Sequence, residues 1–260
     1  MEENDPITLL KPLFEKAQAT EEFEFCCTIL RVRGLESAGW DPLRESYVTM
    51  KQLLGEINSP IDDLFRLRLT LFLYCHATEI EDVYNIIANL LRICKNERFS
   101  MTPFMAELHS SKRPANYPHN KVLRIAEWAT EGGFQAIGES MNFSLVKQVR
   151  NAFMHSDYII HKDKFNISRG EGVLIDGVVT QSVPLQWLTP RLETGINFVL
   201  VTIQLIQEFM ASYKEEKIVV RIIANGSSEK MKLTVDPNSG LNGFRSFTKE
   251  EREKEEVHSA

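Results

Sequence analysis

The residues best suited to chemistry lie in one short stretch, Arg150 to Tyr158 (RNAFMHSDY). The guanidinium group of an arginine presents a planar set of donors that matches a phosphate group. Histidine is the side chain whose ordinary pKa lets it both accept and donate a proton near neutral pH. An arginine, an asparagine and a histidine within six residues therefore indicate phosphate chemistry.

Cleavage of RNA through its own 2′-hydroxyl needs a base, an acid and positive charge beside the phosphorane. His155 would serve as base or acid, and Arg150 would supply the charge. Asn151 would hold His155 or donate a hydrogen bond to phosphate. One histidine rarely performs both proton transfers, so two copies in a dimer make better chemical sense. The alternative is structural, because arginine and histidine often act as partners of the helix dipole.

A helix from about Met141 is expected to carry these residues. Its apolar positions follow helical spacing: Phe143, Val146, Val149 and Phe153. A polar row follows on another face: Ser144, Gln148, Asn151 and His155. Arg150 precedes His155 by five residues, which separates them by roughly 140° around a helix. Either the long arginine bridges this difference, or the two side chains meet only across a subunit interface.

The pattern Arg150-Asn151-x-x-x-His155 resembles the signature of the HEPN superfamily, helical bundles common in prokaryotic toxin, phage-defence and RNA-processing systems. The resemblance covers roughly Ile61 to Ser212. It implies metal-independent cleavage of RNA by a homodimer whose two motifs form one composite site. Arg150 would bind the scissile phosphate, His155 would act as acid or base, and Asn151 would order the site.

The same superfamily contains members that bind RNA, a nucleotide or a protein without cleaving. A non-catalytic binding module therefore stays open as the second hypothesis. Under either hypothesis, an antitoxin or another defence-system protein is a possible partner. The sequence itself identifies neither an RNA target nor such a partner.

Composition places the chain among ordinary soluble proteins. Hydrophobic residues make up 43% and charged residues 25% of its 260 residues. No apolar run approaches the roughly 20 residues that cross a bilayer, and the acidic amino terminus lacks a secretory pattern, so we expect a cytoplasmic protein without a membrane span. The net charge of −6 argues against nonspecific binding of long nucleic acid but permits a local basic pocket.

Cysteine and histidine spacing favours neither a metal nor another cofactor. The four cysteines lack Cys-x-x-Cys spacing and are expected to be small buried hydrophobic residues: Cys26, Cys27, Cys75 and Cys94. The six histidines form no pair at i, i+4 and have no cysteine partners at zinc-like spacing.

Overall, the pattern predicts a mainly α protein. We expect a helical extension over residues 1–58 and a HEPN-like helical bundle over 59–213, with an inserted β-hairpin at about 158–185. A small β-hairpin over 214–247 follows, and then a charged tail over 248–260, either a solvated helix or disordered. The hairpins should turn at Asp176-Gly177 and Asn225-Gly226.

Local signals also predict individual helices. The first should cover Pro6 to Ala19, whereas Phe23 to Val32 could form a strand or a helix. Asp41-Pro42 is typical of a helix start, with an end near Gly55, and Ser59-Pro60 repeats this device.

The core is expected from Ile61 to about Asn96, as two helices or one kinked helix. Another helix should run from Asn120 through Trp128 and stop at Gly132-Gly133, and an apolar helix around Ile196 should end near Tyr213. Four polar residues lie within this core segment: Glu79, Tyr84, Asn85 and Asn89. We expect them to lie at the core edge or in solvent, or alternatively to face the motif.

Overall fold

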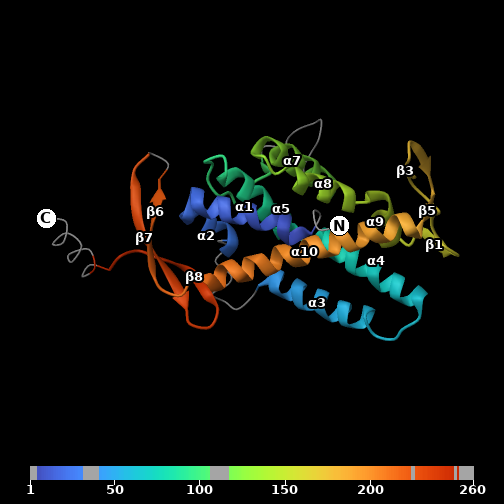
Figure 1. Ribbon diagram of the computed structural model, residues 1–260, viewed down its shortest axis with the longest axis horizontal. Helices are drawn as coiled ribbons and strands as arrows, with labels where there is room; N and C mark the ends of the chain where they lie inside the picture. The colour runs from blue at the N-terminus through green and yellow to red at the C-terminus, as the bar shows by residue number, and fades with distance from the viewer. Residues whose placement is uncertain (1–4, 32–40, 106–116, 224–225, 249–250, 252–260) are drawn as a thin grey trace.

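Helices form most of the chain, which confirms the predicted mainly α fold (Figure 1). The computed structural model describes residues 5–31, 41–105, 117–223, 226–248 and 251. The helices are α1 (Pro6–Thr20), α2 (Glu22–Leu30), α3 (Pro42–Ile57), α4 (Asp63–Glu79), α5 (Glu81–Ile93), α7 (Pro118–Gly132), α8 (Gln135–Ser144), α9 (Lys147–Met154) and α10 (Leu185–Ser212). The strands are β1 (Tyr158–His161), β2 (Lys164–Ile167), β3 (Val173–Ile175), β4 (Val178–Thr180), β5 (Ser182–Pro184), β6 (Lys217–Ile222), β7 (Ser228–Asp236) and β8 (Gly240–Arg245).

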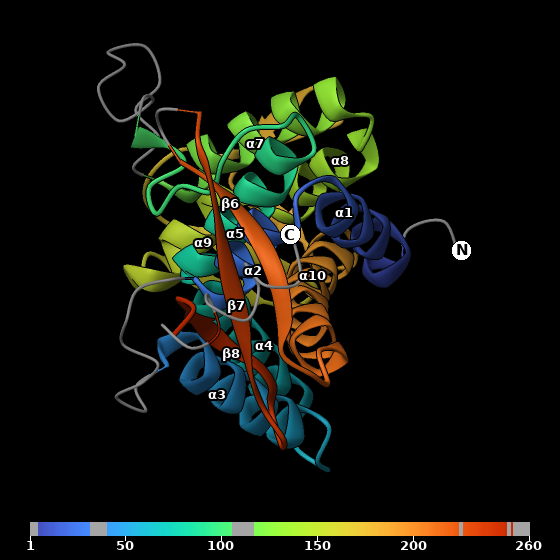
Figure 2. The same cartoon turned by 90° about the vertical axis from the view of Figure 1, so that its left-hand side faces the viewer.

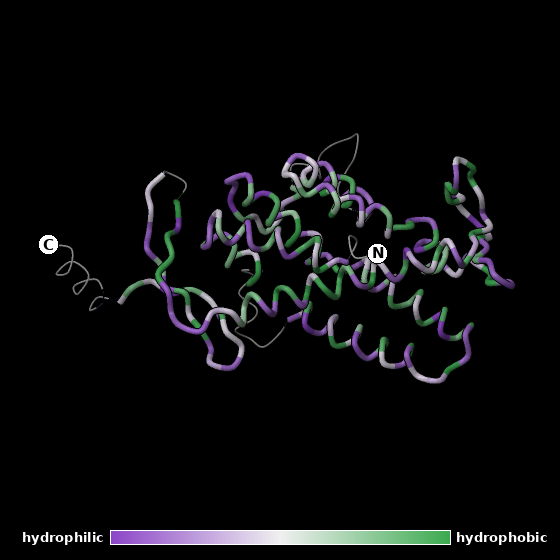
Figure 3. The backbone as a smooth tube through the Cα atoms, viewed as in Figure 1, coloured by the Kyte–Doolittle hydropathy of each residue, from purple (hydrophilic) through white to green (hydrophobic). Residues whose placement is uncertain are grey.

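The helix α10 forms the axis of the molecule, and helices α1 to α5 and α8 all contact it (Figure 1). Its 28 residues are largely apolar, as the hydropathy colouring shows (Figure 3). By length and composition alone, α10 could cross a membrane. The core helix of a soluble protein meets the same criteria, so this helix by itself carries little weight as a membrane span.

Of the two helix starts predicted from capping residues, one is confirmed and one is wrong. The Asp41 carboxylate accepts from the backbone N–H groups of Leu43 and Arg44, which confirms the start of α3. The prediction that Ser59-Pro60 starts a helix is wrong, because these residues lie in the connection before α4. Asp62 caps α4 instead, accepting from the N–H groups of its first turn.

The segment that could have been strand or helix forms α2. Every residue from Phe23 to Leu30 is buried. Apart from Glu24 and Thr28 these residues are apolar, so the segment lacks the clear amphipathic period by which helices are recognised. The predicted pair of core helices is confirmed as α4 and α5, separated at Ile80.

Two small sheets lie beside α9. The predicted hairpin is confirmed as β3 and β4, and both turn residues, Asp176 and Gly177, have positive φ, as a type I′ turn requires. A single inserted hairpin is nevertheless an incomplete description. Strands β1, β2 and β5 form a second, three-stranded antiparallel sheet.

The carboxyl-terminal sheet packs on the far end of α10 (Figure 2). The predicted pair of strands is present as β6 and β7, and a third strand, β8, adds to β7. The rings of Phe23 and Phe244 lie 4.8 Å apart, so the sheet covers an edge of the helical bundle. Most of the charged tail lies outside the described residues, but Glu251 binds Arg245 and Lys232 of the sheet, at 2.8 and 2.6 Å.

The cysteines provide a test of this core. Burial raises the pKa of both Cys26 and Cys75 to about 12, and only Cys94 is partly exposed. We expect Cys94 to react first with a thiol reagent at pH 8, and the other three thiols only after unfolding, because the thiolate is the reactive form. Mass spectrometry of the labelled native and denatured protein measures this order. Fast labelling of Cys26 or Cys75 in the native protein would contradict the fold.

Candidate functional site

The motif is carried by the short helix α9, which a break at Leu145 and Val146 separates from α8. The prediction of one continuous helix from Met141 is therefore wrong. The cause is Tyr74 of α4, whose buried hydroxyl donates to the carbonyl oxygen of Ser144 at 2.9 Å and accepts from the N–H of Val146 at 2.8 Å. These bonds replace part of the backbone pairing that a continuous helix would provide.

The break divides the two predicted rows of side chains. Ser144 is buried on α8 and does not join the polar row, and Phe143 is 42% exposed rather than buried. Val146, Val149 and Phe153 remain buried as predicted. The polar side of α9 itself keeps three members: Gln148, Asn151 and His155 line a common hollow.

His155 lies just beyond the last residue of α9. The N–H of Asp157 bonds to the carbonyl of Ala152 at 2.8 Å, and the N–H of Ser156 bonds to that of Phe153 at 3.1 Å. This is the Schellman arrangement, in which the residue after the cap is left-handed and usually glycine. Here Ser156 takes that conformation, with φ of 59°. The chain thus turns sharply after His155 and enters β1.

Aromatic contacts hold α9 against its neighbours. The ring of Phe153 lies 4.8 Å from that of Phe72 on α4 and 5.0 Å from that of Tyr158 on β1. Tyr158 in turn stacks on Phe165 of β2, with centroids 5.0 Å apart. Each such pair adds about 0.5–1.5 kcal/mol beyond burial. His155 is therefore fixed at the backbone level between two anchored residues, Phe153 and Tyr158.

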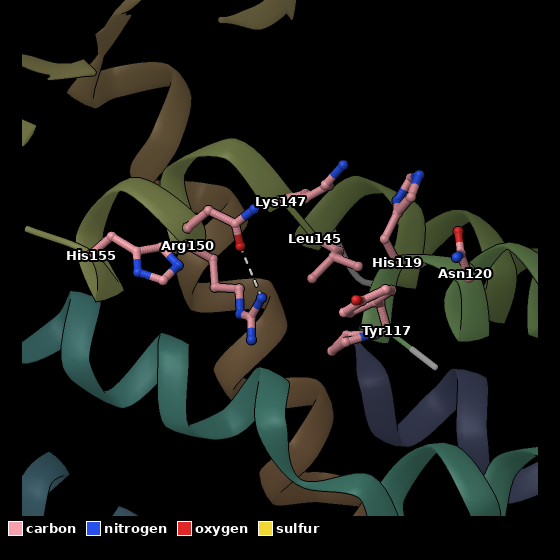
Figure 4. Close-up of a pocket in the computed structure, with 9 residues that line it drawn as sticks. Tyr117, His119, Asn120, Leu145, Lys147, Arg150 and His155 are labelled. Atoms are coloured by element: carbon pink, nitrogen blue, oxygen red, sulfur yellow. Dashed lines mark hydrogen bonds between the residues drawn. The ribbon is translucent and has the colours of Figure 1, made fainter. Parts of the chain in front are cut away.

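Arg150, Asn151 and His155 line a single pocket of about 380 Å³, which we call the motif pocket (Figure 4). The described residues that line it are Tyr117, Pro118, His119, Asn120, Leu145, Lys147, Arg150, Asn151 and His155. Among these described lining residues there is no carboxylate. Of the two alternatives for Arg150 and His155, the structure shows the first: both side chains reach one pocket within a single chain.

Arg150 is held in place by two contacts. It forms an ion pair with Glu79 of α4, and its Nη1 donates to Asn151 Oδ1 at 2.9 Å (Figure 4). The arginine side chain is 22% exposed and that of Glu79 is 44% exposed. The arrangement positions the guanidinium group before any ligand arrives, but it also neutralises part of its charge.

The polar residues of α4 and α5 were expected to face either the motif or the solvent and core edge, and they do not all follow one expectation. Glu79 faces the motif. Tyr84 is buried and donates to the Thr78 carbonyl at 2.8 Å, whereas Asn89 is buried and bonds the backbone of Ser100 in both directions. The expectation that Asn89 faces solvent is therefore wrong.

Sequence reasoning missed the six other described residues of the motif pocket, of which Lys147, Tyr117 and His119 carry polar groups relevant to binding. Lys147 lies four residues before Asn151 on α9, so helical spacing could have indicated it. Tyr117 and His119 come from the start of α7, and no local signal links them to the motif. Burial and the nearby Lys147 lower the pKa of His119, which favours its neutral imidazole.

A second hollow of about 280 Å³ lies on the other side of the motif. Lys147, Asn151 and His155 line both spaces. The second hollow also contains Asp157, Arg169 and Glu171, so its charge is mixed. The motif residues therefore lie between the motif pocket, whose described lining includes cations but no carboxylate, and a second hollow with side chains of both charges.

Comparisons of the chain with protein-family models, curated proteins and solved structures find no match. Within the described part of the chain, no three histidine, cysteine or acidic side chains gather in a way that could hold a metal ion.

Tyr74→Phe should destabilise the protein by about 1–3 kcal/mol, because it leaves the Ser144 carbonyl and the Val146 N–H without their partner. Urea denaturation measures the change. Tyr84→Phe is a matched control that removes one hydrogen bond from the same core and should have a smaller effect. An equal or smaller loss for Tyr74→Phe would show that its hydroxyl does not maintain the break.

Glu79→Gln should strengthen binding of inorganic phosphate to the motif pocket by up to about fivefold, because a half-exposed ion pair contributes ~0–1 kcal/mol. An NMR titration at low salt, following the His155 imidazole, measures the affinity. Glu208→Gln removes the same charge at the far end of α10 and should change nothing. Weaker phosphate binding in Glu79→Gln would mean that positioning of Arg150 outweighs its neutralisation.

Proposed function

We propose that the protein is a metal-independent endoribonuclease of the HEPN type that cleaves RNA by attack of the 2′-hydroxyl on the adjacent phosphate. The observation that carries the proposal is the motif pocket. Arg150, Asn151 and His155 line it together with Lys147, and none of the lining residues that the structure describes is a carboxylate. Such a pocket suits an anion whose negative charge increases during the reaction.

Each motif residue has a role consistent with its contacts. Arg150 and Lys147 would bind the phosphate. Asn151 turns its oxygen towards Arg150, so its amide group is the part suited to donate to a phosphate oxygen. His155 is exposed at the rim and would transfer a proton at the attacking or the leaving oxygen.

A homodimer would complete this chemistry. The two proton transfers occur on opposite sides of phosphorus, and one imidazole serves only one side at a time. Apolar side chains next to the motif are exposed on three elements: Phe72 on α4, Met154 on α9 and Ile159 on β1, between 54% and 62%. A second copy that covers these residues would bring its own His155 to the same site.

The second candidate function is binding of RNA, a nucleotide or a partner protein without cleavage. The observation that favours it is the ion pair of Arg150 with Glu79, which reduces the charge available to a reacting phosphate. Binding would then depend on Arg150 but not on His155. An antitoxin or other defence-system protein could be the partner in either case.

His155→Ala should reduce RNA cleavage by about 10²–10⁴-fold, the usual contribution of a general acid or base. The wild type should cut in the presence of EDTA and leave a 2′,3′-cyclic phosphate, which mass spectrometry of the products identifies. His161→Ala is the matched control, since this exposed histidine on β1 lies outside the motif pocket. Full activity of His155→Ala, or inhibition by EDTA, contradicts the proposal. RNA binding without any product supports the second function.

A further inference from the structure

We propose that Tyr117 forms a stacking platform for a nucleobase, so that the motif pocket holds one whole nucleotide and not a phosphate alone. The identification of the ligand as a nucleotide of RNA rests on the proposed function. The subsite itself rests on the part of the pocket that the motif does not explain.

The motif pocket has two halves of different chemistry. Residues of α9 supply one half, with the cations Lys147 and Arg150. The beginning of α7 and Leu145 supply the other. Figure 4 shows Leu145 and Tyr117 between Arg150 and the pair His119 and Asn120. A nucleotide has the same division, a phosphate joined through a sugar to a flat, largely apolar base.

Tyr117 has the properties of a platform for a base. Its side chain is 65% exposed although it lines a pocket, so most of its surface stays in contact with solvent. Within the described chain, no aromatic ring stacks on it. Unpaired bases of RNA are commonly bound by stacking on such rings. Leu145 offers an apolar contact beside the same space.

The polar groups of this half suit the edge of a base. A neutral imidazole, the form that its surroundings favour for His119, has one donor and one acceptor. His119 is thus suited to hydrogen bonding with a base, while Lys147 and Arg150 bind the phosphate. The pocket volume of about 380 Å³ lies at the lower end of the range for small-ligand sites and suits one nucleotide.

The test compares ligands that differ only in the base. Adenosine 5′-monophosphate, cytidine 5′-monophosphate and ribose 5-phosphate are titrated into the full chain, and NMR or calorimetry gives each Kd. We expect both nucleotides to bind at least about tenfold more tightly than ribose 5-phosphate. Tyr117→Ala should abolish this difference, and Tyr117→Phe should keep it, because the ring provides the stacking.

Controls separate the subsite from folding and from catalysis. Tyr117 is exposed, so Tyr117→Ala should melt within a few degrees of the wild type. Equal affinities for the three ligands, no nucleotide binding, or an unchanged preference in Tyr117→Ala would each overturn the subsite. RNA cleavage that depends on His155 would leave the proposed function standing in those cases. Conversely, base-dependent binding by a chain that cuts no RNA supports the subsite and contradicts only the proposed nuclease activity.

A further binding experiment with RNA tests whether the bound nucleotide belongs to a strand or is a free nucleotide. A short RNA and the same RNA with one abasic nucleotide at the cut site are compared with wild type and Tyr117→Ala. For a nucleotide within a strand, the abasic change and Tyr117→Ala should each weaken binding of RNA, and the two losses should not add. Fully additive losses would show that Tyr117 does not contact that base.

Discussion

The Tyr74 hydroxyl is the group on which the orientation of the motif depends. It occupies both the carbonyl of Ser144 and the N–H of Val146, and so maintains a break where the chain could otherwise continue as a helix. The close approach of three helices makes this possible. A Cβ added at Gly195 of α10 would lie 3.2 Å from the Tyr74 ring and 3.4 Å from the Ser144 side chain. A larger residue at position 195 would therefore disturb the same hydrogen bonds.

The break gives α9 a direction of its own, and the two ends of this helix then have different environments. Arg150 lies near α4, where Glu79 can reach it, whereas His155 lies at the exposed turn before β1. The ion pair favours binding by fixing the guanidinium group and opposes it by reducing the local positive charge. Since the pair is half-exposed and contributes only ~0–1 kcal/mol, a doubly charged phosphate monoester or a strand with several phosphates can compete with the carboxylate.

Periodicity and capping predicted the elements whose structure is decided locally. The helices α1, α3, α4, α5, α7 and α10 and the turn at Asp176-Gly177 belong to this class. The break before α9 could not be predicted, because its cause, Tyr74, lies 72 residues before Val146. Strands β1, β2 and β5 are too short to show a period, and pairing across the fold forms them. The motif residues were found by their types and spacing, but Tyr117 and His119 join them only through tertiary packing.

Binding and cleavage place different demands on this site. A single chain already brings Arg150, Lys147 and Asn151 to one pocket, as the proposed binding of phosphate requires. In-line attack also needs proton transfer at both the entering and the leaving oxygen, which lie on opposite sides of phosphorus. Groups on one face of the phosphate cannot provide both transfers. The exposed position of His155 at the rim, beside exposed apolar residues of α4, α9 and β1, fits a site whose second half comes from another copy. Under the proposed function, a monomer would bind a nucleotide, and only the dimer would cut RNA.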